Sequence, residues 1–216
     1  MVIKLIRHAE SMANVGMLEP AAVGDYSIPL TPAGHEQAQT LGRRLGTEFI
    51  DGALAYTSPY RRARETLAGL LEGAGVPRER LRVYEDPRLR ELDFGYADVK
   101  AQQPMRVTHG WFYYRYAGGE SPADCFDRTS AFVESLMRQM DRKKAERALI
   151  VTHGLTIRCF VMRFLHLPVE QFDNLANPVN CDIVTIAPAA EVPDAQLKTR
   201  KWGVTGLRFY EQQPPA

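Results

Sequence analysis

The sequence predicts an α/β fold, a three-layer α/β/α sandwich around a mainly parallel (mixed) sheet. Short apolar runs of strand length alternate with longer segments whose apolar residues recur at helical spacing. The candidate helices begin at good capping residues, and no internal repeat or low-complexity linker divides the 216 residues. We therefore expect one domain over residues 1–216, which is long enough to bury a substantial core.

The strands are expected where apolar residues form runs of four to seven positions. These runs are residues 2–6, 53–56, 81–84, 148–152 and 181–187, with an edge strand or hairpin within 197–209. The run at 148–152 is the clearest, because it is continuous and is followed at once by a helical pattern. The alternation of strands with helices indicates a sheet covered by helices on both faces.

The helices are expected to start at residues that can cap a free helix end. Thr31 followed by Pro32 predicts a helix from 32 to about 45 or a little beyond, and Ser58 with Pro59 predicts one that ends near Gly73. Ser121 predicts the start of a long third helix. An apolar helix should run from the residues after 153 to about 165.

Composition excludes several classes of partner. The 27 Lys and Arg residues nearly balance 26 Asp and Glu residues, which leaves a net charge of +1. Binding to nucleic acid or to a membrane usually requires a basic excess or cluster, so neither is expected. The first residues are too short an apolar run for a signal peptide or a membrane span. Three separated cysteines without a C-x-x-C motif indicate reduced thiols, and we expect a cytoplasmic protein.

Basic and imidazole side chains follow three of the expected strands. Arg7 and His8 end the first run, Arg61 or Arg62 comes just after the second, and His153 follows the run at 148–152. The carboxyl ends of parallel strands meet at one sheet edge, where ligands bind. Helix N-termini at the last two positions also favour an anion. Phosphoryl transfer needs such converging positive charge, and arginine binds phosphate oxygens bidentately.

Four segments resemble the motifs of a known family. They are residues 5–14 (LIRHAESMAN), 57–66 (TSPYRRARET), 89–95 (LRELDFG) and 151–158 (VTHGLTIR). In this order they are similar to the signature of the histidine phosphatase, or phosphoglycerate mutase-like, superfamily. The resemblance implies a phosphoglycerate mutase-like fold over the whole chain.

The resemblance also implies a role for each matching residue. His8 would attack phosphorus and become phosphohistidine, and water would then hydrolyse that intermediate. Glu91 would protonate the leaving oxygen and later activate the water. The groups that would hold the phosphoryl oxygens are Arg7, Arg62, His153, Asn14 and the backbone N–H of Gly154. Neither a metal nor another cofactor is required, because the arginines supply the positive charge.

The segment around residues 95–120 reads as a substrate-side insertion. It lacks the arginine pair and proline-rich run that cofactor-dependent mutases of the family share. Residues 111–121 (WFYYRYAGGES) instead look like a broad-range phosphatase subgroup, and the similarity continues at 126–128, 171–172 and 177–181. Arg115 is a candidate contact for a distal anionic group. The aromatic residues of 111–116 fit either the packing of a lid or a wall of the substrate site.

Several positions carry a competing interpretation. Ala9 stands where the family usually has glycine, and alanine visits positive φ poorly, so a slightly different turn is expected. Asp93 lies two residues after Glu91 and competes for the acid role. Arg61 and Arg64 fit a solvated helix face. The other histidines have no companions at the spacing of metal ligands, which argues against a metal site at His35, His109 or His166.

The leading hypothesis is a metal-independent phosphatase that hydrolyses phosphomonoesters of small molecules. A phosphoglycerate mutase-type enzyme with the same groups is the first alternative. A phosphate-binding sensor or scaffold without turnover is the second, and the presence of both a nucleophile and a candidate acid argues against it. A homodimer is left open as an assembly state.

Overall fold

A seven-stranded mixed sheet forms the centre of the protein. The computed structural model describes residues 1–210, and in it the strands lie in the order β3-β2-β4-β1-β6-β8-β7. These strands are β1 (Val2–Arg7), β2 (Leu54–Thr57), β3 (Val83–Glu85), β4 (Arg147–Thr152), β6 (Ile183–Pro188), β7 (Leu197–Lys198) and β8 (Trp202–Thr205). The pairs β3–β2, β2–β4 and β4–β1 are parallel, whereas β6, β8 and β7 add to the other side of β1 in antiparallel fashion. The expected mixed sheet is confirmed.

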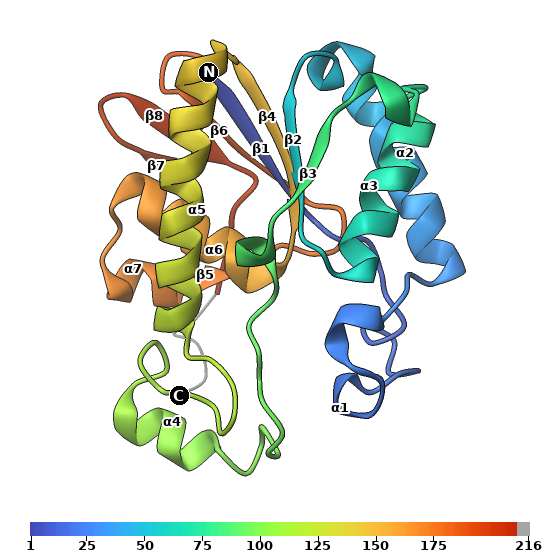
Figure 1. Ribbon diagram of the computed structural model, residues 1–216. Coiled ribbons are helices and arrows are strands. Elements are labelled where there is room, and N and C mark those ends of the chain that lie inside the picture. Colours follow the sequence, from blue (N-terminus) through green and yellow to red (C-terminus); the bar gives the residue numbers. More distant parts are fainter. Residues whose placement is uncertain (211–216) are drawn as a thin grey trace.

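Helices cover both faces of this sheet, as Figure 1 shows. Helices α2 (Pro32–Ile50) and α3 (Arg61–Gly73) pack on one side, and α5 (Pro122–Lys143) and α6 (Gly154–Leu165) pack on the other. The remaining elements are α1 (Pro20–Val23), α4 (Gln103–His109), α7 (Val169–Asn174), the 3-10 turns Asp25–Ser27, Arg78–Arg80 and Pro87–Leu89, and a two-stranded ribbon of β5 (Leu175–Ala176) and β9 (Arg208–Phe209). The arrangement is the predicted α/β/α sandwich.

The central strand β4 shows why both faces must be covered. Ala148 and Ile150 belong to the apolar core under α5 and α6, while Leu149 and Val151 belong to the core under α2 and α3. All four residues are fully buried. Successive side chains of a strand point to opposite faces, so a strand that is apolar at every position requires a helix layer on each side.

The helix starts follow the capping residues, with one correction. The Thr31 hydroxyl accepts a hydrogen bond from the Gly34 N–H at 2.9 Å, and Ser121 forms a capping box with Asp124. Helix α3 was expected to start at Ser58–Pro59, but it begins at Arg61. The two preceding positions are needed for the turn that leaves β2, because the Ser58 hydroxyl accepts from the Tyr60 N–H at 3.3 Å.

Two irregular segments lie beyond the carboxyl edge of the parallel strands, one containing α1 and the other containing α4 (Figure 1). The second segment packs through its aromatic residues. Phe112 and Tyr116 are buried, and Trp111 stacks on Phe172 with ring centroids 5.7 Å apart. Tyr113, in contrast, is exposed. Packing therefore accounts for most of the aromatic patch. Across the described residues, no helix is both long and apolar enough to cross a membrane.

Candidate active site

Strand register brings two histidines together at the carboxyl edge of the sheet. In the parallel pair β1–β4, Arg7 lies opposite Thr152, so the next residue of each strand is a histidine. The His8 N–H continues the ladder by donating to the Thr152 carbonyl at 2.9 Å. The rings of His8 and His153 lie 5.1 Å apart between centroids. The convergence expected from the sequence is thus a direct result of parallel pairing.

Strand β2 adds a third group to the same edge. The Ser58 N–H donates to the Val151 carbonyl at 2.9 Å, which places Ser58 beside the end of β4. Its hydroxyl lies 2.8 Å from Nε2 of His153, and both residues are fully buried. This contact fixes the orientation of the His153 ring. The sequence motif contains Ser58, but sequence reasoning gave it only a role at the start of a helix.

The hydrogen bonds of His8 define its tautomer. Nδ1 lies 2.8 Å from the carbonyl oxygen of Ala9, and because a carbonyl can only accept, Nδ1 carries the proton. Nε2 is therefore the unprotonated nitrogen, and it accepts from Nε of Arg62 at 3.3 Å. Burial and the positive charges of Arg62 and Arg7 hold the pKa of His8 well below its ordinary value. A neutral imidazole with an available Nε2 is the form that a nucleophile requires.

Ala9 fits its position without a strained turn. Its backbone is not in the left-handed region, and its N–H donates to the hydroxyl of Thr66 at 2.9 Å. The side chain is fully buried against Leu30 and Ala38. The expected effect of replacing glycine is therefore not seen, because this turn does not need a positive φ.

Arg62 reaches the site from the first turn of α3 and is only 5% exposed. Its two terminal nitrogens bind the carboxylate of Asp25 at 2.7 and 3.1 Å, and Nη1 also donates to the Asp25 backbone carbonyl at 2.7 Å. This arrangement is the bidentate fork typical of arginine with an oxyanion. Asp25 lies in the irregular segment after α1, where the sequence gave no motif to mark it.

Two buried side-chain nitrogens at this edge have no hydrogen-bond partner within the described residues, Nε of Arg7 and Nδ1 of His153. The Arg7 side chain is anchored through Nη1, which donates to the Pro178 carbonyl at 2.6 Å. Burial and the charge of Arg62 hold the pKa of His153 well below its ordinary value. Leaving a buried donor unpaired costs about 1–3 kcal/mol, so the Arg7 Nε–H favours an acceptor such as a phosphoryl oxygen. Nδ1 of His153 can join it as a donor when it carries the ring proton.

Asn14 and Asn180 border the site next to the first loop, which follows β1 and precedes α1. Oδ1 of Asn14 accepts from the Ser11 N–H and hydroxyl, each at 3.0 Å, and from Nδ2 of Asn180 at 3.1 Å. The amide nitrogen of Asn14 is therefore the end left to donate to a ligand. Asn180 also donates to the His8 carbonyl at 2.9 Å, so it ties the first loop to the loop before β6. Its role was not foreseen, since the resemblance near residue 180 named no function.

Gly154 opens α6 directly after His153. A Cβ atom at this position would come within 2.9 Å of Cγ and 3.0 Å of Cβ of Asn177. The close approach of the 177–180 loop therefore requires glycine here. The first N–H groups of a helix have no partner within it and attract anions, as expected for Gly154.

Glu91 lies within the electrostatic field of Arg62 and Arg7. Burial raises the pKa of Glu91, while the hydrogen bond from the Leu92 N–H and the charges of Arg62 and Arg7 act in the opposite direction. Asp93 is exposed, and its carboxylate accepts from the Gly95 N–H at 2.8 Å in a local turn. A carboxyl with a raised pKa is suited to deliver a proton.

Three other arginines, Arg115, Arg61 and Arg64, do not join the cluster around His8 and His153. Arg115 has a side chain that is 68% exposed and pairs with Asp124. Arg61 is exposed and pairs with Glu65, and Arg64 is exposed too, as expected for a solvated helix face. Among the described residues, three or more His, Cys, Asp or Glu side chains nowhere form a group suited to a metal.

The chain is similar to known proteins over most of its length. The family described as histidine phosphatase superfamily (branch 1) matches residues 3–200. The phosphoglycerate mutase-like protein AT74 of Arabidopsis thaliana is 39% identical over 198 residues, covering 83% of this chain but only 62% of the longer relative. The broad-range acid phosphatase DET1 of Saccharomyces cerevisiae is 26% identical over 300 residues, covering 93% of this chain and 90% of that protein.

A solved structure shares the fold. The alpha-ribazole phosphatase from Shigella flexneri superimposes with a TM-score of 0.72 at 23% identity, covering 96% of each chain. The match over residues 3–200 includes all four motifs and every strand at the carboxyl edge described above. The chain belongs to the histidine phosphatase superfamily.

Proposed function

We propose that the protein is a metal-independent phosphatase that hydrolyses phosphomonoesters of small molecules through a phosphohistidine on His8. The tautomer of His8 carries this proposal. Its Nδ1 donates to a backbone carbonyl, so the unprotonated Nε2 faces Arg62. The nucleophilic nitrogen and an arginine that can hold phosphoryl oxygens are thus in contact. Activity, substrate and reaction course for the whole protein are inferred from this geometry and from the family.

The first half of the reaction forms the intermediate. Nε2 of His8 attacks phosphorus while the bond from phosphorus to the leaving oxygen breaks. Glu91, whose pKa is raised by burial, gives the proton of its protonated form to that oxygen. The charge on the phosphoryl oxygens is held by fixed donors, which are Arg7, Arg62, His153, Asn14 and the Gly154 N–H.

The second half returns the enzyme to its starting state. Water attacks phosphorus as the bond between phosphorus and Nε2 breaks, and Glu91 takes the proton of the water. The products are inorganic phosphate, a neutral His8 and a protonated Glu91. Positioning and positive charge account for the catalysis, and in this proposal the arginines supply the charge that a metal would otherwise provide.

The test is the substitution His8→Ala, with His35→Ala as its matched control, because His35 is an exposed histidine on α2. We expect His8→Ala to lose on the order of 10⁴-fold or more in kcat on p-nitrophenyl phosphate, as when other covalent nucleophiles are removed. Full activity of this variant would refute the mechanism. A strong chelator should leave the wild-type rate unchanged, and sensitivity to it would refute metal independence.

A mutase with the same groups is tested separately, since the name of AT74 points to that chemistry in a relative. We expect 3-phosphoglycerate to yield either free phosphate or no reaction. Its conversion to 2-phosphoglycerate would instead support the mutase.

Two further proposals concern the cellular location of the protein and its domain structure. We propose a cytoplasmic location, because Cys125, Cys159 and Cys181 are free thiols, which are typical of reducing compartments. We also propose that residues 1–216 form one domain, in which 95–120 is a substrate-side insertion. The family match over 3–200 supports this proposal.

A further inference from the structure

The segment that carries Glu91, residues 88–93, has almost no regular backbone structure. Its first two residues belong to the 3-10 turn Pro87–Leu89, and residues 91–95 lie in no helix or strand. A carboxyl that must deliver a proton within hydrogen-bond reach of the leaving oxygen needs a fixed backbone. The support for this segment must therefore come from side chains of other elements.

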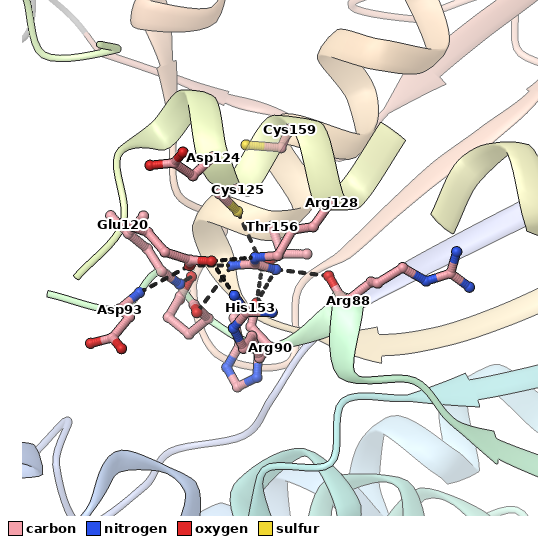
Figure 2. Close-up of polar contacts among 12 residues, drawn as sticks. Arg88, Arg90, Asp93, Glu120, Asp124, Cys125, Arg128, His153, Thr156 and Cys159 are labelled. Atoms are coloured by element: carbon pink, nitrogen blue, oxygen red, sulfur yellow. Dashed lines mark hydrogen bonds and ion pairs between the residues drawn. The ribbon is translucent and has the colours of Figure 1, made fainter. Parts of the chain in front are cut away.

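Arg128 of α5 supplies most of that support. Its Nη1 donates to the carbonyls of Arg88 at 2.7 Å and Arg90 at 2.8 Å, and its Nη2 donates to the carbonyl of Glu91 at 3.1 Å. Figure 2 shows Arg128 between this segment and Glu120. One guanidinium thus binds three carbonyls of the segment that carries the candidate acid.

Glu120 holds Arg128 in that orientation. Nε and Nη2 of Arg128 donate to the two carboxylate oxygens of Glu120 at 3.1 and 3.0 Å. With these two bonds all five N–H groups of Arg128 have an acceptor, so none is left for a substrate. Glu120 also accepts from the Asp93 N–H at 3.3 Å and pairs with Arg90. The Arg128 and Glu120 side chains are only 10% and 13% exposed.

Two threonines tie the same segment to the part of the chain that carries His153. The Thr152 hydroxyl donates to the Leu89 carbonyl at 2.6 Å, and the Thr156 hydroxyl donates to the Arg90 carbonyl at 2.7 Å. The candidate acid is therefore fixed relative to β4 and α6, which also place the phosphoryl-binding histidine. A shift of about 1 Å in such a group can cost about 100-fold in rate.

We propose that the Arg128–Glu120 pair is the positioning device for Glu91, acting on catalysis only through the placement of that carboxyl. The inference rests on the proposed function, because it takes Glu91 as the general acid. Arg128→Lys keeps the positive charge but offers three donors without the planar fork. Glu120→Gln keeps the shape of its side chain and removes the ion pair. Arg138→Lys is the matched control, since Arg138 is an exposed arginine on the same helix.

The dependence of rate on the leaving group separates positioning from general support. Phenyl phosphate needs a proton on its leaving oxygen, whereas 2,4-dinitrophenyl phosphate releases a stable anion without one. We use kcat/KM, which reports steps up to formation of the intermediate. For Arg128→Lys and Glu120→Gln we expect a loss of roughly 10- to 100-fold on phenyl phosphate and less than about threefold on 2,4-dinitrophenyl phosphate. Arg138→Lys should match the wild type on both.

A double-mutant cycle with Glu91→Gln completes the test. If Arg128 acts through Glu91, adding Arg128→Lys to Glu91→Gln should change kcat/KM on phenyl phosphate by less than about threefold. Equal losses on both substrates, or losses that multiply in the cycle, would overturn the positioning role. Full activity of Glu91→Gln alone would instead refute the acid assignment in the proposed function. Thermal melting identifies an unfolded variant, and Glu120→Gln carries the test if Arg128→Lys does not fold.

Discussion

Asp25 binds the two terminal nitrogens of Arg62, which are the atoms that a phosphoryl group would use. Substitution of Asp25 should therefore change the affinity for phosphate by an amount that can be worked out. The carboxylate of Asp25 binds both terminal nitrogens of Arg62, and its side chain is 31% exposed. A hydrogen bond to a charged partner contributes about 1.5–3 kcal/mol, and a neutral one about 0.5–1.5 kcal/mol. Asp25→Asn should therefore weaken the competing contact by about 1 kcal/mol, which corresponds to roughly a fivefold change in an equilibrium constant.

The assay is competitive inhibition by inorganic phosphate at constant ionic strength. We expect the inhibition constant of phosphate to fall about fivefold in Asp25→Asn, because Arg62 is released more easily and a negative charge near the anion is removed. Asp141→Asn is the control, since Asp141 pairs with Lys144 on the exposed end of α5. A higher inhibition constant would show that Asp25 orients Arg62 instead of competing for it, and an unchanged one would show that phosphate does not use these two nitrogens.

Two further predictions concern pH and stability. The pKa of His8 is lowered and that of Glu91 is raised, so neutral His8 and protonated Glu91 coexist at acidic pH, and kcat/KM should be highest there. The decline at higher pH should disappear in Glu91→Gln measured on the same substrate; its persistence would assign that limb to another group. Gly154→Ala should lower the free energy of unfolding by about 1–3 kcal/mol, because the new methyl group would meet Asn177 at 2.9 Å. A melting temperature equal to the wild type would show that the 177–180 loop moves freely.

The strand-borne half of the site could be predicted from sequence because the carboxyl ends of parallel strands meet at one edge of a sheet. Apolar runs that end in Arg7 and His8 and in His153 must bring these residues to one edge once the strands pair. The same reasoning placed Arg61 or Arg62 at the start of the next helix, which begins at Arg61 and not at Ser58–Pro59 as expected. Hydrophobic patterning and capping residues were enough for these placements, but the choice of Arg62 over Arg61 came from the family motif.

The loop-borne half could not be predicted in the same way. Asp25, Asn180 and Arg128 reach the site through contacts between residues far apart in the chain, such as Asn180 with His8, which are separated by 172 positions. No periodicity specifies which carbonyl a buried arginine will bind. The resemblance supplied Glu91, but the hydrogen bonds that hold its segment depend on the packing of α5 beside it, which no local pattern specifies.

The strand-borne and loop-borne halves of the site are held in place by different parts of the structure. Apart from Asn14, the groups proposed to bind the phosphoryl oxygens are placed by β1, β4 and the first turns of α3 and α6, which are anchored to the sheet. Glu91 is placed by side-chain hydrogen bonds, above all those of Arg128. A change in the second support should therefore leave the inhibition constant of inorganic phosphate unchanged while it lowers the rate on poor leaving groups. Thr152 and Thr156 link the Glu91 segment to β4 and α6, but within the described residues Arg128 of α5 forms hydrogen bonds only with that segment and Glu120. A substitution of Arg128 can therefore alter proton delivery to the leaving group without rebuilding the site proposed to hold the phosphoryl oxygens.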